Sequence, residues 1–340
     1  MSTIIGITGD PDCPYRASAD QVILQTSWLL RFNVIYCTFL TAGCFAGIVY
    51  CIKYMRKHPI FNESTQILLY MSLIFAVIHD VAHLCLQWTL MYRSFYYADD
   101  PCNLLVSFDD CLPFSRPLMF GITGLIYIHS ALTLDGLLAT FLPHIYYQNN
   151  YVPGAIIALL MIVFNCVIHG FVIPFGSTEV DYVPSCQFFP KFLATRANNF
   201  LISSLCVTVI NLIINLILLR VNQIHSKGTR FDVQFRYQRS EAIITSKSIS
   251  LLVIAQISAL AIYTGGTYLF RLAKDQIPVS MYNNIVIWVY ALSYSTVTLP
   301  LLIIFCIKYV RRHRQRTIHH ITNHKESQKN RMDELKAIWG

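Results

Sequence analysis

Charged residues are scarce in this sequence. Asp, Glu, Lys and Arg make up 13% of its 340 residues, whereas hydrophobic residues make up 55%. Because a soluble domain carries about a quarter charged residues, this composition indicates an integral membrane protein. The sequence also contains no GxSxG, no HExxH and no glycine-rich phosphate loop, which are common marks of soluble catalytic sites. We therefore expect a protein that is not an enzyme and that needs no cofactor.

A signal peptide and an internal repeat are also missing. The first residues, MSTIIGITGDPDCPY, contain no basic segment followed by an apolar block. We therefore expect the first membrane helix to act as its own insertion signal. Without a repeat, the sequence gives no support to an inverted-repeat transporter.

Seven apolar stretches have the length of about 20 residues that a helix needs to cross the hydrocarbon of a bilayer. Polar or proline-containing segments such as KHPIFNES separate them. The fold predicted is an all-α membrane protein with a seven-transmembrane helix bundle at 32–307, an N-terminal segment at 1–31 and a basic tail at 308–340. The stretches lie at about 32–54, 65–89, 116–140, 153–175, 200–221, 248–270 and 283–307.

Lys and Arg are distributed unequally over the two sides of this predicted bundle. Of the 26, eighteen lie on the side of the C-terminal tail and eight on the side of the N-terminus. The positive-inside rule then predicts an extracellular N-terminus and a cytoplasmic C-terminus. The same bias explains most of the net charge of +8 through attraction to anionic lipid, without a nucleic-acid partner. The sequon Asn62–Glu63–Ser64 falls in the first inner loop, so we expect it to be unglycosylated.

The 11 cysteines divide by location. Seven fall within predicted helices, where small apolar packing is their expected role. Four lie on the oxidising outer side, and an even number there predicts two disulfides with three possible pairings. We favour Cys111–Cys186, with Cys13–Cys102 next.

Asp135 lies near the end of the third apolar stretch and has an informative spacing. In rhodopsin-like G-protein-coupled receptors, a helix-3 cysteine joins the second outer loop, and an acidic–Arg pair follows 24 residues later. Asp135 lies 24 residues after Cys111, so the chain resembles these receptors and its fold is expected to be GPCR-like. The chain departs from their pattern at Gly136, where the arginine is expected.

The chain is also similar to a narrower family, the nematode serpentine chemoreceptors of class alpha (Sra), with the alpha/beta and beta classes as neighbours. The resemblance covers most of the chain. It implies a receptor in the plasma membrane of a sensory neuron or its cilium that detects a small chemical cue and signals to a heterotrimeric G protein. It rests on DPCNLL, DDC, TLDGLLATFLPHIY, FDVQFRYQRSEAIITSKSIS, YSTVTLP and LKAIW.

Three residues are candidates for a conformational switch. Asp135 is predicted either as a latch that changes partner between two receptor states or as a hydrated, inert interfacial acid. Gly136 replaces the arginine usual in these relatives, so a receptor-like protein with impaired coupling to its G protein is an alternative. Pro300 resembles the helix-7 proline of such receptors, and a proline tends to kink a membrane helix.

A ligand pocket is predicted near the outer ends of the second, third, sixth and seventh helices. His79 and His83 are four residues apart and share a helix face with Asp80 close by. They could bind a metal or a proton, form a satisfied polar cluster, or line the pocket. An aromatic wall with a few polar groups suits a small organic ligand, although an aromatic belt at the membrane interface explains some of these residues equally well. The pocket candidates are His79, Asp80, His83, Gln87, Arg116, Tyr263, Asn284 and Trp288.

The basic third inner loop and tail are predicted either to contact the G protein or to anchor on lipid. The expected partners are therefore the cue, the G protein and the bilayer, and a receptor oligomer is left open. A transporter or channel is the alternative class, but it would need polar residues along a continuous path. An intramembrane enzyme would lack a convincing nucleophile. The candidate G-protein contacts are Arg236, Arg239, Lys247 and Arg311.

Overall fold

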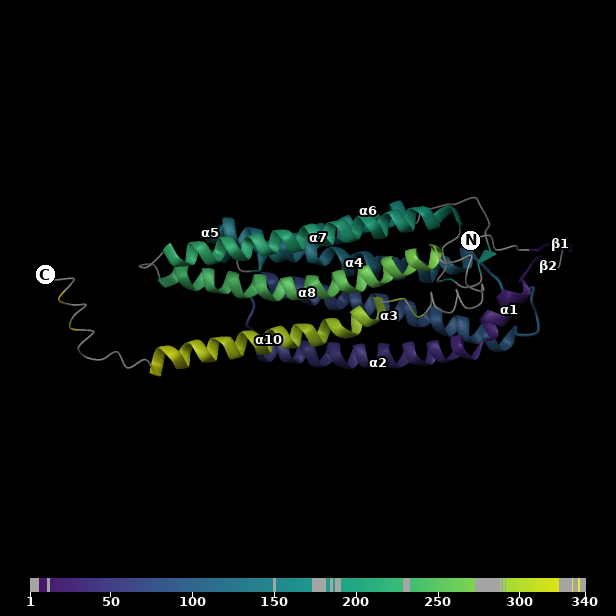
Figure 1. The fold of residues 1–340 in the computed structure, drawn as a ribbon, viewed down its shortest axis with the longest axis horizontal. Helices are drawn as coiled ribbons and strands as arrows, with labels where there is room; N and C mark the ends of the chain where they lie inside the picture. The colour runs from purple at the N-terminus through teal and green to yellow at the C-terminus, as the bar shows by residue number, and fades with distance from the viewer. Residues whose placement is uncertain are drawn as a thin grey trace.

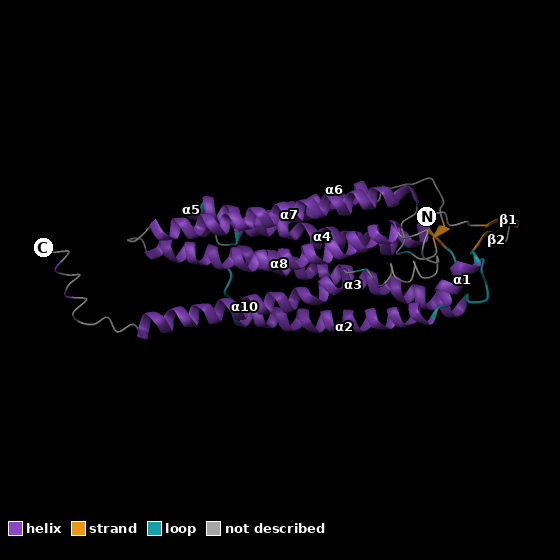
Figure 2. Ribbon diagram, viewed as in Figure 1, coloured by secondary structure: helices purple, strands orange, loops and turns teal. Residues whose placement is uncertain are grey.

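The computed structural model of the chain is a bundle of long helices with two small two-stranded antiparallel sheets (Figures 1 and 2). The residues that it describes are 6–10, 13–148, 151–172, 182–183, 186, 191–228, 233–272, 288, 290, 292–323, 332 and 336. Within this part of the chain, six helices are long and apolar enough to cross a membrane, and Val152–Ile168 is a shorter apolar helix. The six are Trp28–Lys57, Glu63–Tyr96, Phe108–Phe141, Asn199–Ile224, Ile243–Ile262 and Leu292–Arg316.

The elements follow the chain in a simple order. The long helices run lengthwise beside one another (Figure 1). They are α2 (Trp28–Lys57), α3 (Glu63–Tyr96), α4 (Phe108–Phe141), α6 (Val152–Val172), α7 (Lys191–Gly228), α8 (Val233–Leu272) and α10 (Leu292–Asn323). The short elements are β1 (Gly6–Asp10), β2 (Cys13–Arg16), α1 (Ala19–Thr26), β3 (Val106–Ser107), α5 (Pro143–Gln148) and β4 (Tyr182–Val183).

Two names are used below for the ends of the bundle. The hairpin end carries β1, β2 and α1, and the tail end is where α2 and α10 finish (Figure 1). At the hairpin end, β1 pairs with β2 and β3 pairs with β4, both antiparallel. The backbone N–H of Ala17 donates to the carbonyl of Pro101, which ties the start of α1 to the loop after α3.

Most of the helices are longer than the apolar stretches predicted them to be. The stretch at 116–140 becomes Phe108–Phe141, and 248–270 becomes Val233–Leu272. The length of an apolar stretch corresponds to the part of the helix within the hydrocarbon of the bilayer. Polar residues at either end continue the helix beyond it. Pro113 and Pro117 do not end α4, because neighbouring helices can satisfy the groups that a proline frees in a membrane helix. The seventh stretch is described as a continuous helix only from Leu292.

Glycines on α4 let it approach α3 closely. A Cβ added at Gly121 would lie 2.7 Å from the backbone nitrogen of His79, and one at Gly124 would overlap the Phe75 ring. Small residues allow this kind of backbone contact between membrane helices. The contact fixes the segment of α3 that carries the predicted histidine cluster.

A row of polar side chains joins α4 to α7. The amide of Asn211 donates to Ser130 and that of Asn215 to Thr133, both at 2.7 Å. Nearer the tail end, the amide of Asn222 donates to Thr140 at 2.9 Å. Such bonds hold helices together where lipid offers no hydrophobic driving force. We call these three pairs the α4–α7 ladder.

The outward-facing side chains are largely apolar. On α6, Leu159 and Val167 are exposed by 63% and 65%, and on α2 Phe39 is exposed by 72%. A surface of this kind suits contact with lipid tails and would be unusual on a monomeric soluble protein. The chain is therefore a multi-pass membrane protein.

The Cys111–Cys186 disulfide is present and joins the first turn of α4 to the segment after β4, with the two Cα atoms 5.2 Å apart. Cys102 is also disulfide-bonded. Its predicted partner, Cys13, has a side chain outside the described residues, so that pairing stays a prediction.

Candidate functional site

His79 and Asp80 lie at the middle of α3. The helix extends from Glu63 to Tyr96, so the two residues are central rather than in its outer half, as the apolar stretch at 65–89 implied. His83 and Gln87 follow one and two turns nearer the hairpin end. All four are buried, with no more than 2% of any of them exposed.

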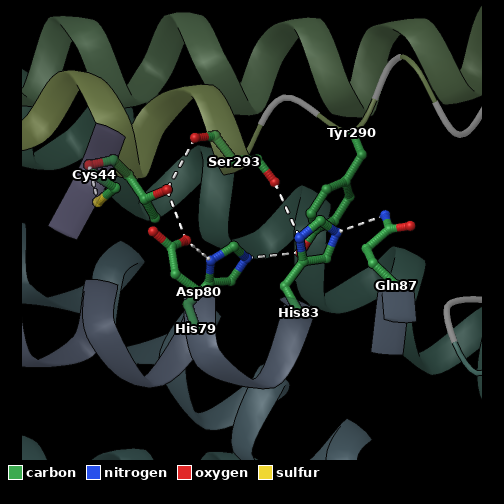
Figure 3. Close-up of polar contacts among 8 residues, drawn as sticks. Cys44, His79, Asp80, His83, Gln87, Tyr290 and Ser293 are labelled. Atoms are coloured by element: carbon green, nitrogen blue, oxygen red, sulfur yellow. Dashed lines mark hydrogen bonds and ion pairs between the residues drawn. The ribbon is translucent and has the colours of Figure 1, made fainter. Parts of the chain in front are cut away.

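Asp80 binds groups from two helices through one carboxylate oxygen. Its Oδ1 accepts from Nδ1 of His79 at 2.8 Å and from the Thr296 hydroxyl of α10 at 2.9 Å (Figure 3). The Thr296 carbonyl in turn accepts from the Cys44 thiol of α2 at 3.2 Å. Asp80 Oδ2 is buried without a hydrogen-bond partner among the described residues. Three helices therefore meet at this carboxylate, which keeps one oxygen able to accept a further donor.

His79 and His83 form a stack with Tyr290. The two histidine rings lie 5.7 Å apart and nearly parallel, and the His83 ring lies 5.0 Å from that of Tyr290. Because His79 donates from Nδ1 to Asp80, its Nε2 can accept from the Tyr290 hydroxyl at 2.9 Å. Polar groups of Asp80, His79 and Tyr290 therefore lie along one side of the stack.

Hydrogen bonds also assign the tautomer of His83. The Gln87 amide nitrogen contacts Nε2 at 3.2 Å, which makes Nε2 the acceptor and leaves the proton on Nδ1. Nδ1 then faces the Ser293 hydroxyl of α10 at 3.5 Å (Figure 3). Both histidines are thus engaged by protein groups on both nitrogens, and α3 is joined to α10 along the stack.

The arrangement does not resemble a metal site. Among the described residues, no group of three or more His, Cys, Asp or Glu side chains is placed to hold an ion. The cluster instead places flat aromatic rings beside hydrogen-bonding groups, the kinds of group that line sites for small organic molecules.

The other predicted pocket residues do not join this cluster within the described structure. Trp288 packs against α2, with its ring 6.1 Å from that of Phe32 and 5.6 Å from that of Tyr36. Arg116 is partly buried on α4, five residues after Cys111. The side chain of Tyr263 and all of Asn284 lie outside the described residues.

Asp135 is buried at the tail end, with 1% of it exposed. Its oxygens accept from the hydroxyls of Ser64 and Thr65, the latter at 2.6 Å, and from the Tyr146 hydroxyl of α5 at 3.0 Å. The prediction of a hydrated acid at the interface is therefore wrong, because three hydroxyls take the place of water. The prediction of a latch is not tested by this geometry.

The start of α3 explains how a carboxylate can be buried there. Asn62 is the N-cap residue, and its side chain accepts from the backbone N–H of Glu63. Ser64 and Thr65 lie in the first turn, where the positive end of the helix dipole stabilises an anion. Burial, followed by the Asp135 carboxylate, raises the pKa of the Tyr146 phenol, so this hydroxyl stays protonated and keeps donating.

Gly136 and Pro300 lie at close helix contacts. A Cβ at Gly136 would meet the Leu218 side chain at 3.6 Å, an ordinary contact, so packing does not require glycine there. By contrast, a Cβ at Gly47 of α2 would lie 3.2 Å from the Pro300 ring, so this proline packs tightly against α2.

The predicted G-protein contacts are described only in part. Lys247 of α8 and Arg311 of α10 are exposed, whereas the side chains of Arg236 and Arg239 lie outside the described residues. Arg311 donates to Nε2 of His58 at 3.3 Å. Partial burial, followed by the charges of Arg311 and Lys57, lowers the pKa of His58. The loop after α2 is thus held against α10.

The sequence did not single out the partners of the histidine cluster or of Asp135. Tyr290, Ser293 and Thr296, just before and within α10, recur every three residues, which is a signal for one polar face. At the tail end, Ser64 had been considered only as part of a glycosylation sequon. The missed residues are Thr296, Ser293, Tyr290, Ser64, Thr65 and Tyr146.

Similarity to known proteins runs through nearly the whole chain. Residues 12–339 match the family described as serpentine type 7TM GPCR chemoreceptor Sra. Serpentine receptor class alpha-10 of Caenorhabditis briggsae is 39% identical over 95% of this chain and 97% of the relative. Its counterpart in Caenorhabditis elegans is 37% identical over 95% and 96%. Serpentine receptor class alpha-12 of Caenorhabditis elegans is 32% identical over 95% and 99%.

Proposed function

The chain belongs to the Sra family of serpentine 7TM GPCR chemoreceptors, and we propose that it detects a small organic cue and activates a heterotrimeric G protein. The hairpin end faces the exterior and the tail end faces the cytoplasm, which agrees with the excess of Lys and Arg near the tail. The receptor resides in the plasma membrane of a sensory neuron or its cilium.

One observation carries the proposal for ligand recognition. The stack of His79, His83 and Tyr290 joins α3 to α10 beside the Asp80 carboxylate. A flat cue with a hydrogen-bond donor can lie against these rings and reach the carboxylate. Because Tyr290 directly precedes α10 and Ser293 of α10 contacts His83, a ligand that prefers one arrangement of α3 and α10 shifts the receptor between states.

A ligand screen with G-protein activation as its readout tests this function. Once a cue is found, His83→Phe should raise its half-maximal concentration by about tenfold, because the ring loses the contacts with Gln87 and Ser293 that hold it in the stack, and about 1.4 kcal/mol corresponds to a factor of ten. Trp88→Phe is the matched control, since Trp88 is on the same helix and 52% exposed. An unchanged response in His83→Phe would contradict recognition by the stack.

A receptor with impaired coupling is the second candidate, because Gly136 stands where relatives of the resembled class carry arginine. The space around Gly136 admits a side chain. If coupling is impaired by the missing cation, Gly136→Arg in the otherwise wild-type receptor should raise signalling several-fold. Signalling that does not change would count against impairment.

A further inference from the structure

The tail end contains a cavity of about 260 Å³. Its wall combines residues that lie far apart in the sequence: the 59–62 loop, Thr65 of α3, Asp135 and Gly136 of α4, and Arg314 of α10. The tyrosines of α5 and the tail-side part of α8 complete the wall. The cavity therefore lies between the elements that would have to move if the tail end changed its shape.

Two lining residues carry opposite formal charges, Asp135 and Arg314. The guanidinium of Arg314 donates to the carbonyl of Ile60 at 3.1 Å. Asp135 accepts from its three hydroxyls, and the salt bridges of the described residues do not join it to Arg314. An acidic and a basic side chain thus line one cavity.

No long side chain of α4 projects between them from the positions that line the cavity. After Asp135, the lining residues of α4 are Gly136 and Ala139. A glycine within a helix costs about 1 kcal/mol relative to alanine, and the packing at Gly136 does not demand it. What the glycine leaves is open space next to the carboxylate.

We propose that Arg314 is the cation of the tail-end switch and replaces the arginine missing at Gly136. In the second receptor state, its guanidinium leaves the Ile60 carbonyl, crosses the cavity and pairs with Asp135. Arginine suits this role because its planar fork can bind both carboxylate oxygens and stays charged. This inference rests on the proposed signalling to a G protein.

The two arrangements of Arg314 and Asp135 should be close enough in free energy for their exchange to act as a switch. In the present arrangement, hydroxyls and the α3 N-terminus already stabilise Asp135. Forming an ion pair with Arg314 would replace these interactions, so the two arrangements should differ little in free energy. A small difference keeps both states accessible to a ligand. α10 would then couple the ligand stack at Tyr290 to the inner face.

Signalling by the full-length receptor in cells tests the assignment. Arg314→Gln should lower the response about fivefold or more, the lower end of coupling between receptor states. Arg314→Lys, which keeps the charge, should retain more of it. In an Asp135→Asn background, Arg314→Gln should have no further effect, and adding Gly136→Arg to Arg314→Gln should restore the response.

Arg312→Gln is the matched control, because Arg312 is exposed on the same helix and does not line the cavity. The proposal is overturned if Arg314→Gln responds like the wild type. It is also overturned if Arg314→Gln loses as much in the Asp135→Asn background as it does alone.

A second measurement is independent of the G protein. In the purified Arg314→Lys variant, a zero-length carbodiimide should link position 314 to Asp135, and mass spectrometry should identify the joined peptides. The same reagent should give no such link in Arg312→Lys. Absence of the link at position 314 contradicts the switch. A link in a receptor that activates no G protein contradicts only the proposed function.

Discussion

Asp80 and Asp135 show at the residue scale how this bundle keeps carboxylates away from water. Asp80 is held by a histidine and a threonine, and Asp135 by three hydroxyls at the start of α3. Buried charges persist only when donors surround them. The two sites use different donors because one lies mid-helix and the other lies beside a helix N-terminus.

Removing the Asp80 carboxylate should therefore destabilise the receptor. Asp80→Ala leaves Nδ1 of His79 without its acceptor and Thr296 with the Ser293 carbonyl alone, and it should lower the free energy of unfolding by about 2 kcal/mol or more. Asp80→Asn keeps an oxygen in place and should cost less than half of that. Thermal unfolding of purified protein measures the difference, with Val81→Ala on the exposed face of the same helix as control. Equal midpoints for Asp80→Ala and the control would contradict the network.

At the element scale, one close helix contact is that between α3 and α4. Gly121 and Gly124 permit it, and it holds the segment of α3 that carries His79. The loop after α2 is fixed separately, because Arg311 of α10 donates to His58. Each contact predicts a distinct response to substitution or to pH.

Gly124→Ala should destabilise the bundle by about 1–3 kcal/mol, because the added Cβ overlaps Phe75 and a packed core resists the extra volume. Adding Phe75→Leu should recover part of the loss. Gly43→Ala is the control, since nothing lies within 4 Å of its Cβ, and a helical alanine should leave stability equal or higher. Unfolding midpoints compare the three proteins, and a Gly124→Ala variant as stable as wild type would refute the close contact.

His58 should make stability sensitive to mild acid. Its pKa in the folded protein lies below the usual 6.5, so the unfolded chain takes up the proton first as the pH falls. The contribution of His58 is therefore complete above about pH 6.5 and declines below it. Between about pH 7.5 and 5.5, the unfolding midpoint of wild type should fall more than that of His58→Gln. Parallel curves for the two proteins would show that His58 is not perturbed.

At the scale of the whole molecule, the sequence predicts the helices better than their contacts. The length of an apolar stretch can be read from consecutive residues, so the predicted stretches locate all seven long helices. The α4–α7 ladder is different: the spacing of Asn211, Asn215 and Asn222 indicates one face of a helix. That face could meet any neighbour, and only the packed bundle shows that it meets α4.

In the candidate site, too, the sequence predicts individual residues better than their contacts. His79, Asp80 and His83 stand out because polar residues are costly in an apolar helix. Their partners Tyr290 and Ser293 lie more than 200 residues later, just before and within the first turn of α10, and no local pattern links them to α3. The role of Arg314 could not be predicted from the sequence either. A basic tail predicts only a cytoplasmic location, and not the cavity that one of its arginines lines.

Ligand binding from outside and signalling from the tail end both require that the two ends of the bundle face opposite sides of the membrane. Epitope tags at each terminus of the full-length receptor, stained in intact and permeabilised cells, measure this directly. We expect the N-terminal tag to be stained in intact cells and the C-terminal tag only after permeabilisation. Staining of the C-terminal tag in intact cells would place the cavity of Asp135 and Arg314 outside the cell and contradict a receptor that signals from this face.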